Sequence, residues 1–266
     1  MSHVPPYLGT NNKLMEALQD LATKDTAEYF YNLEQQPEFI PNEIIRSPFS
    51  PRAVDREIVT FRKLDDSKEE LRKLAAEQIE TDGRTGFVAE FGCNKGASFI
   101  PLCARFPDQK VFGFDGFDGL PGDKWEGNLV HKGAFKHEGK CPFVIPKNGV
   151  ITEGWFNDTL PAFDFGHGTA AFLHIDCDVY SSTVTILKEM EPYIAKGTVI
   201  VFDDYCNHTN WRQGEWKAWQ EYCRRTGTRY EYLYVAGMST AVKIIRDSAY
   251  GSNRAGNADR RIVPVK

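Results

Sequence analysis

Three aspartates stand where two apolar segments of this sequence end. Asp176 follows the segment 170–175, and Asp203 and Asp204 follow the segment 198–202. If these segments are adjacent parallel strands, their carboxyl ends lie side by side and the three carboxylates converge. Grouped carboxylates repel one another strongly at reduced dielectric unless a cation neutralises them. Oxygen ligands suit a hard ion, so we expect Asp176, Asp203 and Asp204 to bind Mg²⁺, with Mn²⁺ or Ca²⁺ as alternatives.

The residues around these aspartates have other expected roles. Asp178 precedes Ser181 and the expected start of a helix, which favours an N-cap. His174 lies inside an apolar segment and is expected to be a core histidine rather than a metal ligand. For Asp176, Asp203 and Asp204 the alternative is a structural role as helix caps and turn residues.

A loop with two glycines follows an earlier apolar segment, at Glu90-Phe91-Gly92-Cys93-Asn94-Lys95-Gly96. Glycines let the backbone turn sharply and pass close to a ligand. A dinucleotide site would want the spacing GxGxxG, whereas the spacing here is GxxxG. The Glu90 carboxylate would repel a pyrophosphate, but it suits the ammonium group in the methionine part of S-adenosylmethionine (SAM). We therefore expect SAM rather than a dinucleotide.

The next two apolar segments end in residues that fit the rest of SAM. Asp115 ends the segment 111–114, where an acid can accept hydrogen bonds from both ribose hydroxyls. Gly154 and Trp155 follow the segment 150–152 and are expected to line the adenine. The alternatives are that Asp115 caps a turn and that Trp155 is a core aromatic residue.

A metal ion beside a methyl donor has a direct chemical use. A sugar or phenol hydroxyl is a poor nucleophile while it is protonated. Coordination to a metal ion lowers the pKa of the hydroxyl and holds it opposite the sulfonium methyl for in-line transfer. Two neighbouring acceptor oxygens could chelate the ion, so that geometry would select the hydroxyl. These residues therefore indicate a metal-dependent O-methyltransferase with a small-molecule acceptor.

Alternating strand and helix patterns must position these residues. Apolar segments predict strands at 87–91, 111–114, 150–152, 170–175 and 198–202, and helical spacing predicts helices at 97–105, 182–194 and 213–225. Residues 230–245 predict a hairpin of two further strands with a turn at Gly237. Together these elements predict an α/β fold with a doubly wound, mostly parallel, seven-stranded sheet.

The first part of the chain has a different pattern. Residues 13–21 and 68–79 predict helices. The charge run from Arg62 to Glu80 alternates in sign and predicts the solvated face of a helix. Four prolines between the two helices predict a loop or short turns: Pro37, Pro41, Pro48 and Pro51.

Composition and charge exclude several classes of protein. The 266 residues carry a net charge of −5, without the clustered Lys and Arg of a nucleic-acid-binding surface. No apolar stretch reaches the length of a membrane span, and the first residues lack the pattern of a secretory signal. The 6 cysteines lack CxxC or zinc-type spacing, which indicates reduced thiols. We expect a cytoplasmic enzyme with no nucleic-acid or membrane partner.

Several motifs, in order from about Val88 to Ala241, resemble the macrocin O-methyltransferase (TylF-type) family. They are Glu90-Phe91-Gly92-x-x-Lys95-Gly96-Ala97-Ser98, Phe112-Gly113-Phe114-Asp115, Gly154-Trp155-Phe156-x-Asp158-Thr159-Leu160-Pro161, His174-Ile175-Asp176-Cys177-Asp178-x-Tyr180-Ser181-Ser182-Thr183, Phe202-Asp203-Asp204-Tyr205 and Gly214-Glu215-Trp216. The resemblance implies a class I SAM methyltransferase fold of the Rossmann-like type, SAM as methyl donor, Mg²⁺, and often a deoxysugar hydroxyl of a natural product as acceptor.

The resemblance also implies roles for individual residues. Asp176, Asp203 and Asp204 would be the metal ligands, with Asp176 also a candidate base. Glu215 and Trp216 would border the acceptor pocket, with helix packing as the alternative for Trp216. The expected cofactor-binding residues are Glu90, Gly92, Lys95, Gly96, Ser98, Asp115, Gly154, Trp155 and Asp176.

One departure from related enzymes concerns the catalytic base. Catechol-type and caffeoyl-CoA-type enzymes place a lysine base three residues beyond the first metal aspartate, and here that residue is Val179. A lysine base at this position is ruled out. His208 and His131 are further candidate bases, with a solvated loop histidine as the alternative for each.

We expect three parts in the chain: a helical extension that covers the acceptor over residues 1–82, a SAM-binding domain over 83–250 and a polar tail over 251–266. The leading hypothesis is methylation of a sugar hydroxyl on a natural product or glycan. A catechol- or phenol-type O-methyltransferase and a non-catalytic SAM-binding protein are the alternatives, and an NAD-dependent oxidoreductase is less favoured than either. A symmetric homodimer is also expected, from the frequency of such dimers and the extra helices.

Overall fold

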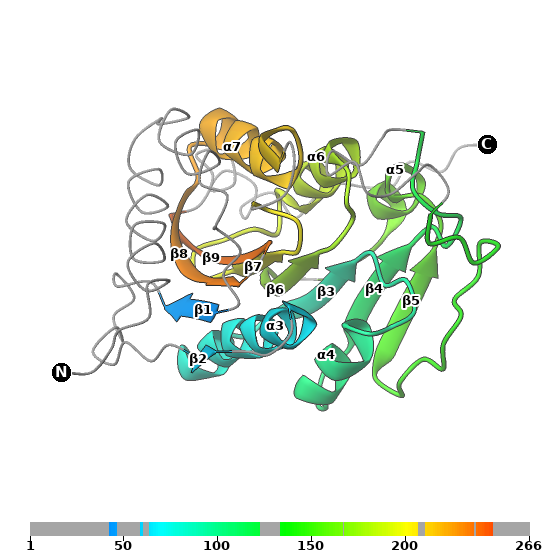
Figure 1. The fold of residues 1–266 in the computed structure, drawn as a ribbon, viewed down its shortest axis with the longest axis horizontal. Helices are drawn as coiled ribbons and strands as arrows, with labels where there is room; N and C mark the ends of the chain where they lie inside the picture. Colours follow the sequence, from blue (N-terminus) through cyan, green and yellow to red (C-terminus); the bar gives the residue numbers. More distant parts are fainter. Residues whose placement is uncertain are drawn as a thin grey trace.

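The computed structural model describes residues 68–122, 134–166, 168–206, 211–236 and 238–246, and the backbone of residues 43–46, 59–60 and 64–67. Figure 1 shows one twisted sheet with helices on both faces. The strands are β1 (Glu43–Arg46), β2 (Val59–Thr60), β3 (Phe87–Phe91), β4 (Val111–Asp115), β5 (Gly149–Glu153), β6 (Ala170–Ile175), β7 (Val199–Phe202), β8 (Arg229–Ala236) and β9 (Ser239–Arg246). The helices are α3 (Leu64–Thr81), α4 (Phe99–Arg105), α5 (Phe156–Thr159), α6 (Tyr180–Met190) and α7 (Glu215–Thr226), with short 3₁₀ turns at Leu160–Ala162 and Trp211–Gln213.

The sheet has the doubly wound arrangement that the sequence predicts. Its strand order is β2-β1-β8-β9-β7-β6-β3-β4-β5. Strands β5, β4, β3, β6 and β7 run parallel, and β9 and β8 follow as an antiparallel hairpin. The order reverses between β3 and β6, so the carboxyl ends of these two strands flank the place where such folds bind ligands. All seven predicted strands are present within a residue or two of their predicted bounds.

Two short strands extend this sheet beyond the prediction. The Pro-rich segment was predicted to be a loop, but β1 lies within it and pairs antiparallel with β8, with Ile45 opposite Val235. β2 in turn pairs with β1. The edge of β8 carries unpaired backbone groups, and pairing with a distant segment satisfies them. Local sequence does not encode such a long-range pairing, which is why the loop prediction was wrong here.

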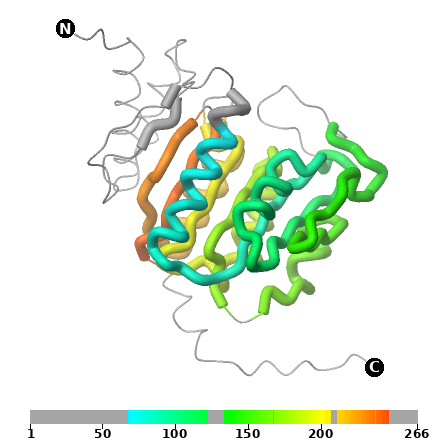
Figure 2. Tube along the Cα trace, turned by 90° about the horizontal axis from the view of Figure 1, so that it is seen from below, coloured from blue at the N-terminus to red at the C-terminus, as the bar shows by residue number. Residues whose placement is uncertain are grey.

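The sheet divides the core into two layers. Helices α3 and α4 cover one face, and α5, α6 and α7 cover the other (Figures 1 and 2). Because side chains alternate along a strand, Val88 and Phe172 point toward the α3 face, and so do Glu90 and His174 two residues later. Asp203 follows Val201 of β7 in the same alternation. A row of polar groups therefore lies under α3 at the end of the sheet.

α3 contains the predicted helix 68–79 and packs directly on the sheet. Its buried apolar side chains are Leu71, Ala75, Ala76 and Ile79. Gln78 donates a hydrogen bond of 2.8 Å to the Tyr234 hydroxyl, which ties the helix to β8. These contacts fix the rotation of α3, and with it the direction of the charged side chains one turn earlier.

Helix bounds differ modestly from the prediction. The helix predicted at 182–194 is α6, which begins at Tyr180 and ends at Met190. Pro192 lacks a backbone N–H, and the amides of Tyr193 and Ile194 both donate to the Met190 carbonyl in a tight turn. The hairpin of β8 and β9 is confirmed. The predicted helix 13–21, the turn residue Gly237 and the tail 251–266 lie outside the described residues.

Candidate active site

A cleft of about 810 Å³ opens at the carboxyl ends of the parallel strands. It reaches from the glycine loop after β3 to the ends of β6 and β7. Among the residues predicted to bind a cofactor or metal, seven line it: Gly92, Ser98, Asp115, Trp155, Asp176, Asp203 and Asp204. The fold thus brings residues from more than a hundred positions apart in the sequence into one cavity.

Gly92 lies at the point where the loop passes closest to β6. Its φ of +97° is in the region that favours glycine, and an added Cβ would lie 1.7 Å from the Asp176 carbonyl oxygen. No side chain fits at this position without moving one of the two backbones. The close approach places the glycine loop directly beside the first predicted metal ligand.

The Asp115 carboxylate braces the glycine loop as well as lining the cleft. Its Oδ2 accepts hydrogen bonds from the backbone N–H groups of Cys93 and Asn94, at 2.8 and 2.7 Å. Its Oδ1 accepts one from Phe117 N–H at 2.7 Å. The sequence indicated an acid at this strand end but not these three backbone donors, which depend on how the loop folds back over β4.

Glu90 lies beneath the floor of the cleft rather than in its wall. The side chain is 0% exposed, and its Oε1 accepts a hydrogen bond of 2.6 Å from the Ser98 hydroxyl. Ser98 lines the cleft, whereas Glu90 does not. A ligand ammonium in the cleft would therefore meet Ser98 first, and direct contact between Glu90 and SAM remains a prediction.

Three other predicted cofactor residues do not line this cleft. Lys95 is exposed, and Gly96 packs under the Phe143 ring. Gly154 adopts a φ of +136° and precedes Trp155. Trp155 itself is 38% exposed and lies against Gly116 at the cleft, so the alternative of a core aromatic residue is wrong.

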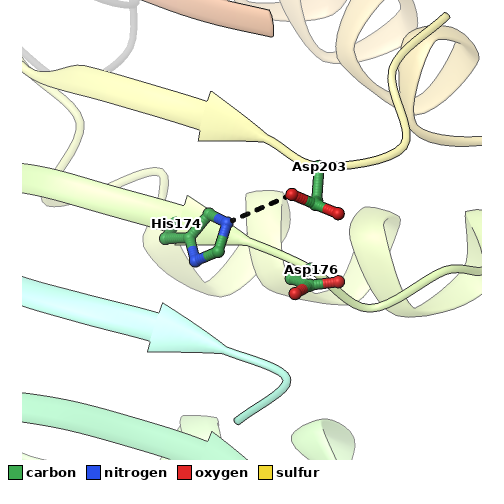
Figure 3. Close-up of side chains that lie close together, drawn as sticks. All are labelled: His174, Asp176 and Asp203. Carbon is green, nitrogen blue, oxygen red and sulfur yellow. Dashed lines mark ion pairs between the residues drawn. The ribbon is translucent and has the colours of Figure 1, made fainter. Parts of the chain in front are cut away.

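The three predicted metal ligands all line the cleft at the ends of β6 and β7, but their oxygens fall in two groups that share Asp176. In the first group, ligand atoms of His174, Asp176 and Asp203 lie within 4.8 Å of one another. In the second group, carboxylate oxygens of Asp176, Asp178 and Asp204 lie within the same distance of one another. Figure 3 shows His174, Asp176 and Asp203 gathered at the two strand ends. Burial, followed by the charge of Asp203, raises the pKa of Asp176 well above its usual value. Carboxylates grouped in this way favour a nearby cation.

Asp178 belongs to this cluster and does not cap a helix. The N-cap position of α6 is Val179, with no side-chain capping hydrogen bond. A φ of +63° at Asp178 turns its side chain away from the helix and into the cleft. Burial and the neighbouring Asp204 and Asp176 carboxylates raise the pKa of Asp178 to about 9. The predicted cap is wrong because the loop turns one residue before the helix begins.

His174 is buried, as predicted, but its ring faces charges instead of the apolar core. Nε2 lies 3.8 Å from Asp203 Oδ1, and Nδ1 lies 3.6 Å from Glu90 Oε2. Burial alone would lower the pKa of His174, but these two carboxylates raise it to about 9. The His174 ring therefore lies between the acids of β3 and β7.

Two cations of α3 reach the acidic cluster, and sequence reasoning missed them. Lys68 Nζ lies 2.5 Å from Asp203 Oδ2, and Arg72 Nη1 lies 3.3 Å from Asp203 Oδ1. Their side chains are 13% and 19% exposed, so this part of the charge run is not a solvated face. The one signal was their spacing of four residues, in register with the apolar face of the predicted helix. These charges, with His174, hold the pKa of Asp203 well below its usual value although burial alone would raise it.

Glu215 is a buried residue that contacts the backbone of the acidic cluster. It is 0% exposed, does not line the cleft, and accepts a hydrogen bond of 3.0 Å from the Asp204 backbone N–H. Trp216 packs edge-on against Trp211, at 5.4 Å between ring centroids. The expectation that both border the acceptor pocket is wrong for this cleft, because α7 presents them to the core. His208 and His131 lie outside the described residues.

Comparisons with known proteins agree with this fold. Residues 89–205 match the family described as a methyltransferase domain. Over 212 residues the chain is 24% identical to 8-demethyl-8-(2,3-dimethoxy-alpha-L-rhamnosyl)-tetracenomycin-C 4'-O-methyltransferase of Streptomyces olivaceus, covering 72% of this chain and 77% of that protein.

Two solved structures show the same fold. The O-methyltransferase NovP superposes with a TM-score of 0.54 at 20% identity, covering 71% of this chain and 81% of NovP. CalS11, a calicheamicin methyltransferase, superposes with a TM-score of 0.51 at 17% identity, covering 91% of this chain and 94% of that one. The predicted fold, the Rossmann-like class I SAM methyltransferase fold, is confirmed.

The matched methyltransferase domain and the O-methyltransferase relatives define the class of this enzyme: it is a SAM-dependent O-methyltransferase. Its sequence is homologous to O-methyltransferases of natural products. Among the described helices, none combines the length and the hydropathy that a membrane crossing requires.

Proposed function

We propose that this enzyme uses a bound divalent metal ion, Mg²⁺ in the first place, to methylate a hydroxyl of a sugar carried by a natural product. One observation carries the proposal: the Asp176, Asp203 and Asp204 carboxylates share a cleft with the glycine loop and Asp115. A methyl donor and a metal-bound acceptor placed there would lie within one cavity. The macrocin-type family is the relationship that the ordered motifs favour.

The side chains at the strand ends fit a hard metal ion. Asp176 and Asp204 offer carboxylate oxygens close to one another, with Asp178 beside them. Asp203 and Asp204 are 6% and 5% exposed, so the acids are largely withdrawn from water. Buried, like-charged oxygen donors without a nearby metal are costly, and Mg²⁺ prefers oxygen ligands of this kind. We propose Asp176, Asp203 and Asp204 as the ligands.

SAM would occupy the half of the cleft formed by β3, β4 and β5. Asp115 supplies a carboxylate for the ribose hydroxyls, and Trp155 supplies an exposed ring at the cleft for the adenine. Gly92 keeps the loop clear of side-chain atoms. Glu90, Lys95, Gly96, Ser98 and Gly154 complete the proposed cofactor-binding set.

The acceptor would enter from the side of α3. Lys68, Glu69 and Arg72 of this helix line the cleft. This supports the proposal that residues 1–82 form an extension that covers the acceptor. The relative from Streptomyces olivaceus acts, by its name, on a dimethoxyrhamnosyl group, which favours a sugar over a catechol as acceptor here.

In the proposed reaction the residues of the chain bind and orient the acceptor and take up the proton of its hydroxyl. A bound Mg²⁺ would supply Lewis-acid polarisation of the acceptor hydroxyl. Asp176, which lies between the two halves of the cleft, would hold the acceptor oxygen in line with the methyl group and accept its proton. His208 is the alternative base. The buried Glu215 and Ser239 would keep Asp204 and Asp203 in place through their hydrogen bonds.

Calorimetric titration of SAM and of Mg²⁺ into EDTA-treated protein tests this proposal. We expect both to bind the wild type, and we expect Asp203→Ala to bind SAM normally while its Mg²⁺ affinity falls at least a hundredfold. Asp108→Ala, at an exposed loop position, is the matched control and should bind both ligands as the wild type does. If the wild type binds SAM but no divalent ion, the metal assignment is wrong.

The acceptor class needs its own measurement. Methyl transfer from labelled SAM would be followed with rhamnosides and other deoxysugar glycosides on one side and catechols on the other. Turnover of glycosides that disappears with EDTA supports the proposal. Turnover of catechols alone would favour the phenol-type alternative, and no turnover of any acceptor with tight SAM binding would favour a non-catalytic role.

A further inference from the structure

The two oxygens of the Asp203 carboxylate have different partners. Oδ1 accepts a hydrogen bond of 3.0 Å from the Ser239 hydroxyl and lies 3.3 Å from Arg72 Nη1. His174 Nε2 lies 3.8 Å from the same atom (Figure 3). Within the described part of the chain, Oδ2 has a single polar partner, Lys68 Nζ at 2.5 Å. One oxygen is therefore anchored by the fold, and the other is held by one flexible side chain.

The Lys68 ammonium lies between the two neighbouring aspartates. It is 2.5 Å from Asp203 Oδ2 and 3.9 Å from Asp204 Oδ1. A magnesium ion bound by these carboxylates would sit about 2.0–2.1 Å from its ligand oxygens. An ion that bound both Asp203 Oδ2 and Asp204 would lie between these two carboxylates, where the ammonium group is. Two cations cannot share this position, so one must leave when the other binds.

The Lys68 ammonium group can leave the carboxylates without a change in the backbone. Its side chain is a flexible four-carbon stem, and the residue lines the open cleft, so the ammonium can swing from the carboxylates into solvent. Arg72 does not need to move, because it contacts Oδ1 rather than Oδ2. Asp203 would thus keep its orientation through Ser239, Arg72 and His174 while the partner of Oδ2 changes.

We propose that Lys68 is a displaceable counter-ion of the metal site, whose ammonium occupies the position of the divalent ion until the ion displaces it. The inference rests on the metal-binding part of the proposed function. In the metal-free protein Lys68 neutralises two buried carboxylates that would otherwise repel each other. Its displacement removes one contact between α3 and the acidic cluster.

Titration of Mn²⁺ into EDTA-treated protein by calorimetry tests the competition. Lys68→Met removes the competing charge but keeps the length of the side chain, so we expect Mn²⁺ to bind at least tenfold more tightly than to the wild type. The metal-free variant should also unfold at a lower temperature, because Asp203 Oδ2 and Asp204 lose their counter-ion. Lys68→Arg retains the charge and should bind Mn²⁺ within threefold of the wild type.

The matched control is Lys73→Met, on the same helix. The Lys73 side chain is 56% exposed and pairs with Glu70 instead of the acidic cluster. We expect its Mn²⁺ affinity to equal that of the wild type. An unchanged or weaker Mn²⁺ affinity in Lys68→Met would overturn the proposal, because a lysine that only supports the fold, or that assists the metal, gives that result.

A second measurement uses the wild type, so it does not depend on whether a variant folds. Acetylation of lysines by an amine-reactive ester would be followed by mass spectrometry with and without Mn²⁺. Displacement predicts that Mn²⁺ raises the labelling rate of Lys68 at least fivefold relative to Lys73. If the wild type binds Mn²⁺ and this ratio stays unchanged, the inference fails while the metal site stands. If the wild type binds no Mn²⁺, the metal site and the inference fail together.

Discussion

Asp115 and Asp203 both stand at strand ends, but the partners of their carboxylates differ and indicate different roles. Asp115 faces three backbone N–H groups, which order the loop where the donor would bind. Asp203 faces two cations, a hydroxyl and an imidazole, which hold it in the acidic cluster. Asp115 thus orders the glycine loop, and Asp203 lies in surroundings suited to binding a cation.

Asp115→Asn tests the first of these roles. The amide nitrogen cannot accept a hydrogen bond, so at least one backbone N–H of the loop or one ribose hydroxyl loses its partner. Each hydrogen bond to a charged group contributes about 1.5–3 kcal/mol, so we expect SAM to bind at least tenfold more weakly. Calorimetric titration of SAM measures the effect. SAM affinity equal to that of the wild type would remove Asp115 from the cofactor site.

His174 gives the metal-free protein a pH dependence. Its pKa in the folded protein is raised to about 9, from an ordinary value of 6.5, by Asp203 and Glu90 against the opposing effect of burial. The stabilisation is complete below pH 6.5 and is lost as the pH rises through 9. We expect the free energy of unfolding to fall across this window by on the order of 3 kcal/mol.

Urea unfolding of EDTA-treated protein from pH 6 to 9.5 measures this loss. His174→Asn cannot carry the charge, so its unfolding free energy should be lower at pH 6 and should fall much less with pH. The same slope in the variant and the wild type would show that other groups cause it.

At the scale of secondary structure, the entry of the chain into the sheet is held by one side chain. Arg84 precedes β3, and its guanidinium donates to the Lys196 carbonyl at 2.5 Å and to the Ala170 carbonyl at 3.0 Å. It also reaches the hydroxyls of Thr169 and Thr198, at 2.9 and 3.1 Å. These contacts tie together the starts of β3, β6 and β7, at the end of the sheet opposite the cleft.

Arg84→Met should therefore lower stability without touching the chemistry. Arg84 is half-exposed, so in the variant water can replace part of the lost hydrogen bonds. We therefore expect the free energy of unfolding to fall by about 2–3 kcal/mol. Urea denaturation measures this, and the SAM affinity of the folded variant should equal that of the wild type. A weaker SAM affinity would show that the two ends of the sheet are coupled.

At the scale of the whole molecule, the cleft has two halves on either side of the β3–β6 boundary. The proposed donor half comes from β3, β4 and β5, and the proposed metal half comes from β6 and β7. The Gly92 backbone touches the Asp176 backbone at the boundary. Rigid strands carry both halves, so filling one should leave the geometry of the other nearly unchanged.

We therefore expect SAM and Mg²⁺ to raise the temperature of thermal unfolding independently. Each ligand stabilises the folded protein by an amount set by its concentration and dissociation constant. Thermal unfolding of EDTA-treated protein with SAM, with Mg²⁺, and with both should give shifts that add. A combined shift much larger than the sum would mean that the two sites are coupled through the loop.

The sequence by itself determined the strands, their order of appearance and the acids at their ends. Buried parallel strands are short apolar runs, and the loops at their carboxyl ends carry the polar residues, so both signals are local. The segments 87–91 and 170–175 match β3 and β6 residue for residue. That Asp176, Asp203 and Asp204 all line one cleft follows from the same pattern, because parallel strands end at one edge of the sheet.

Only the tertiary structure decided which charges face those acids. Lys68 and Arg72 precede Asp203 by more than a hundred residues, and their contact with it depends on how α3 rotates on the sheet. Asp178 joins the cluster through a turn in the left-handed region, and β1 joins β8 through a long-range pairing. Electrostatic contacts act through space at a few ångströms, whereas sequence patterns report neighbours along the chain. The counter-ions of the site therefore become visible only once the helix is packed on the sheet.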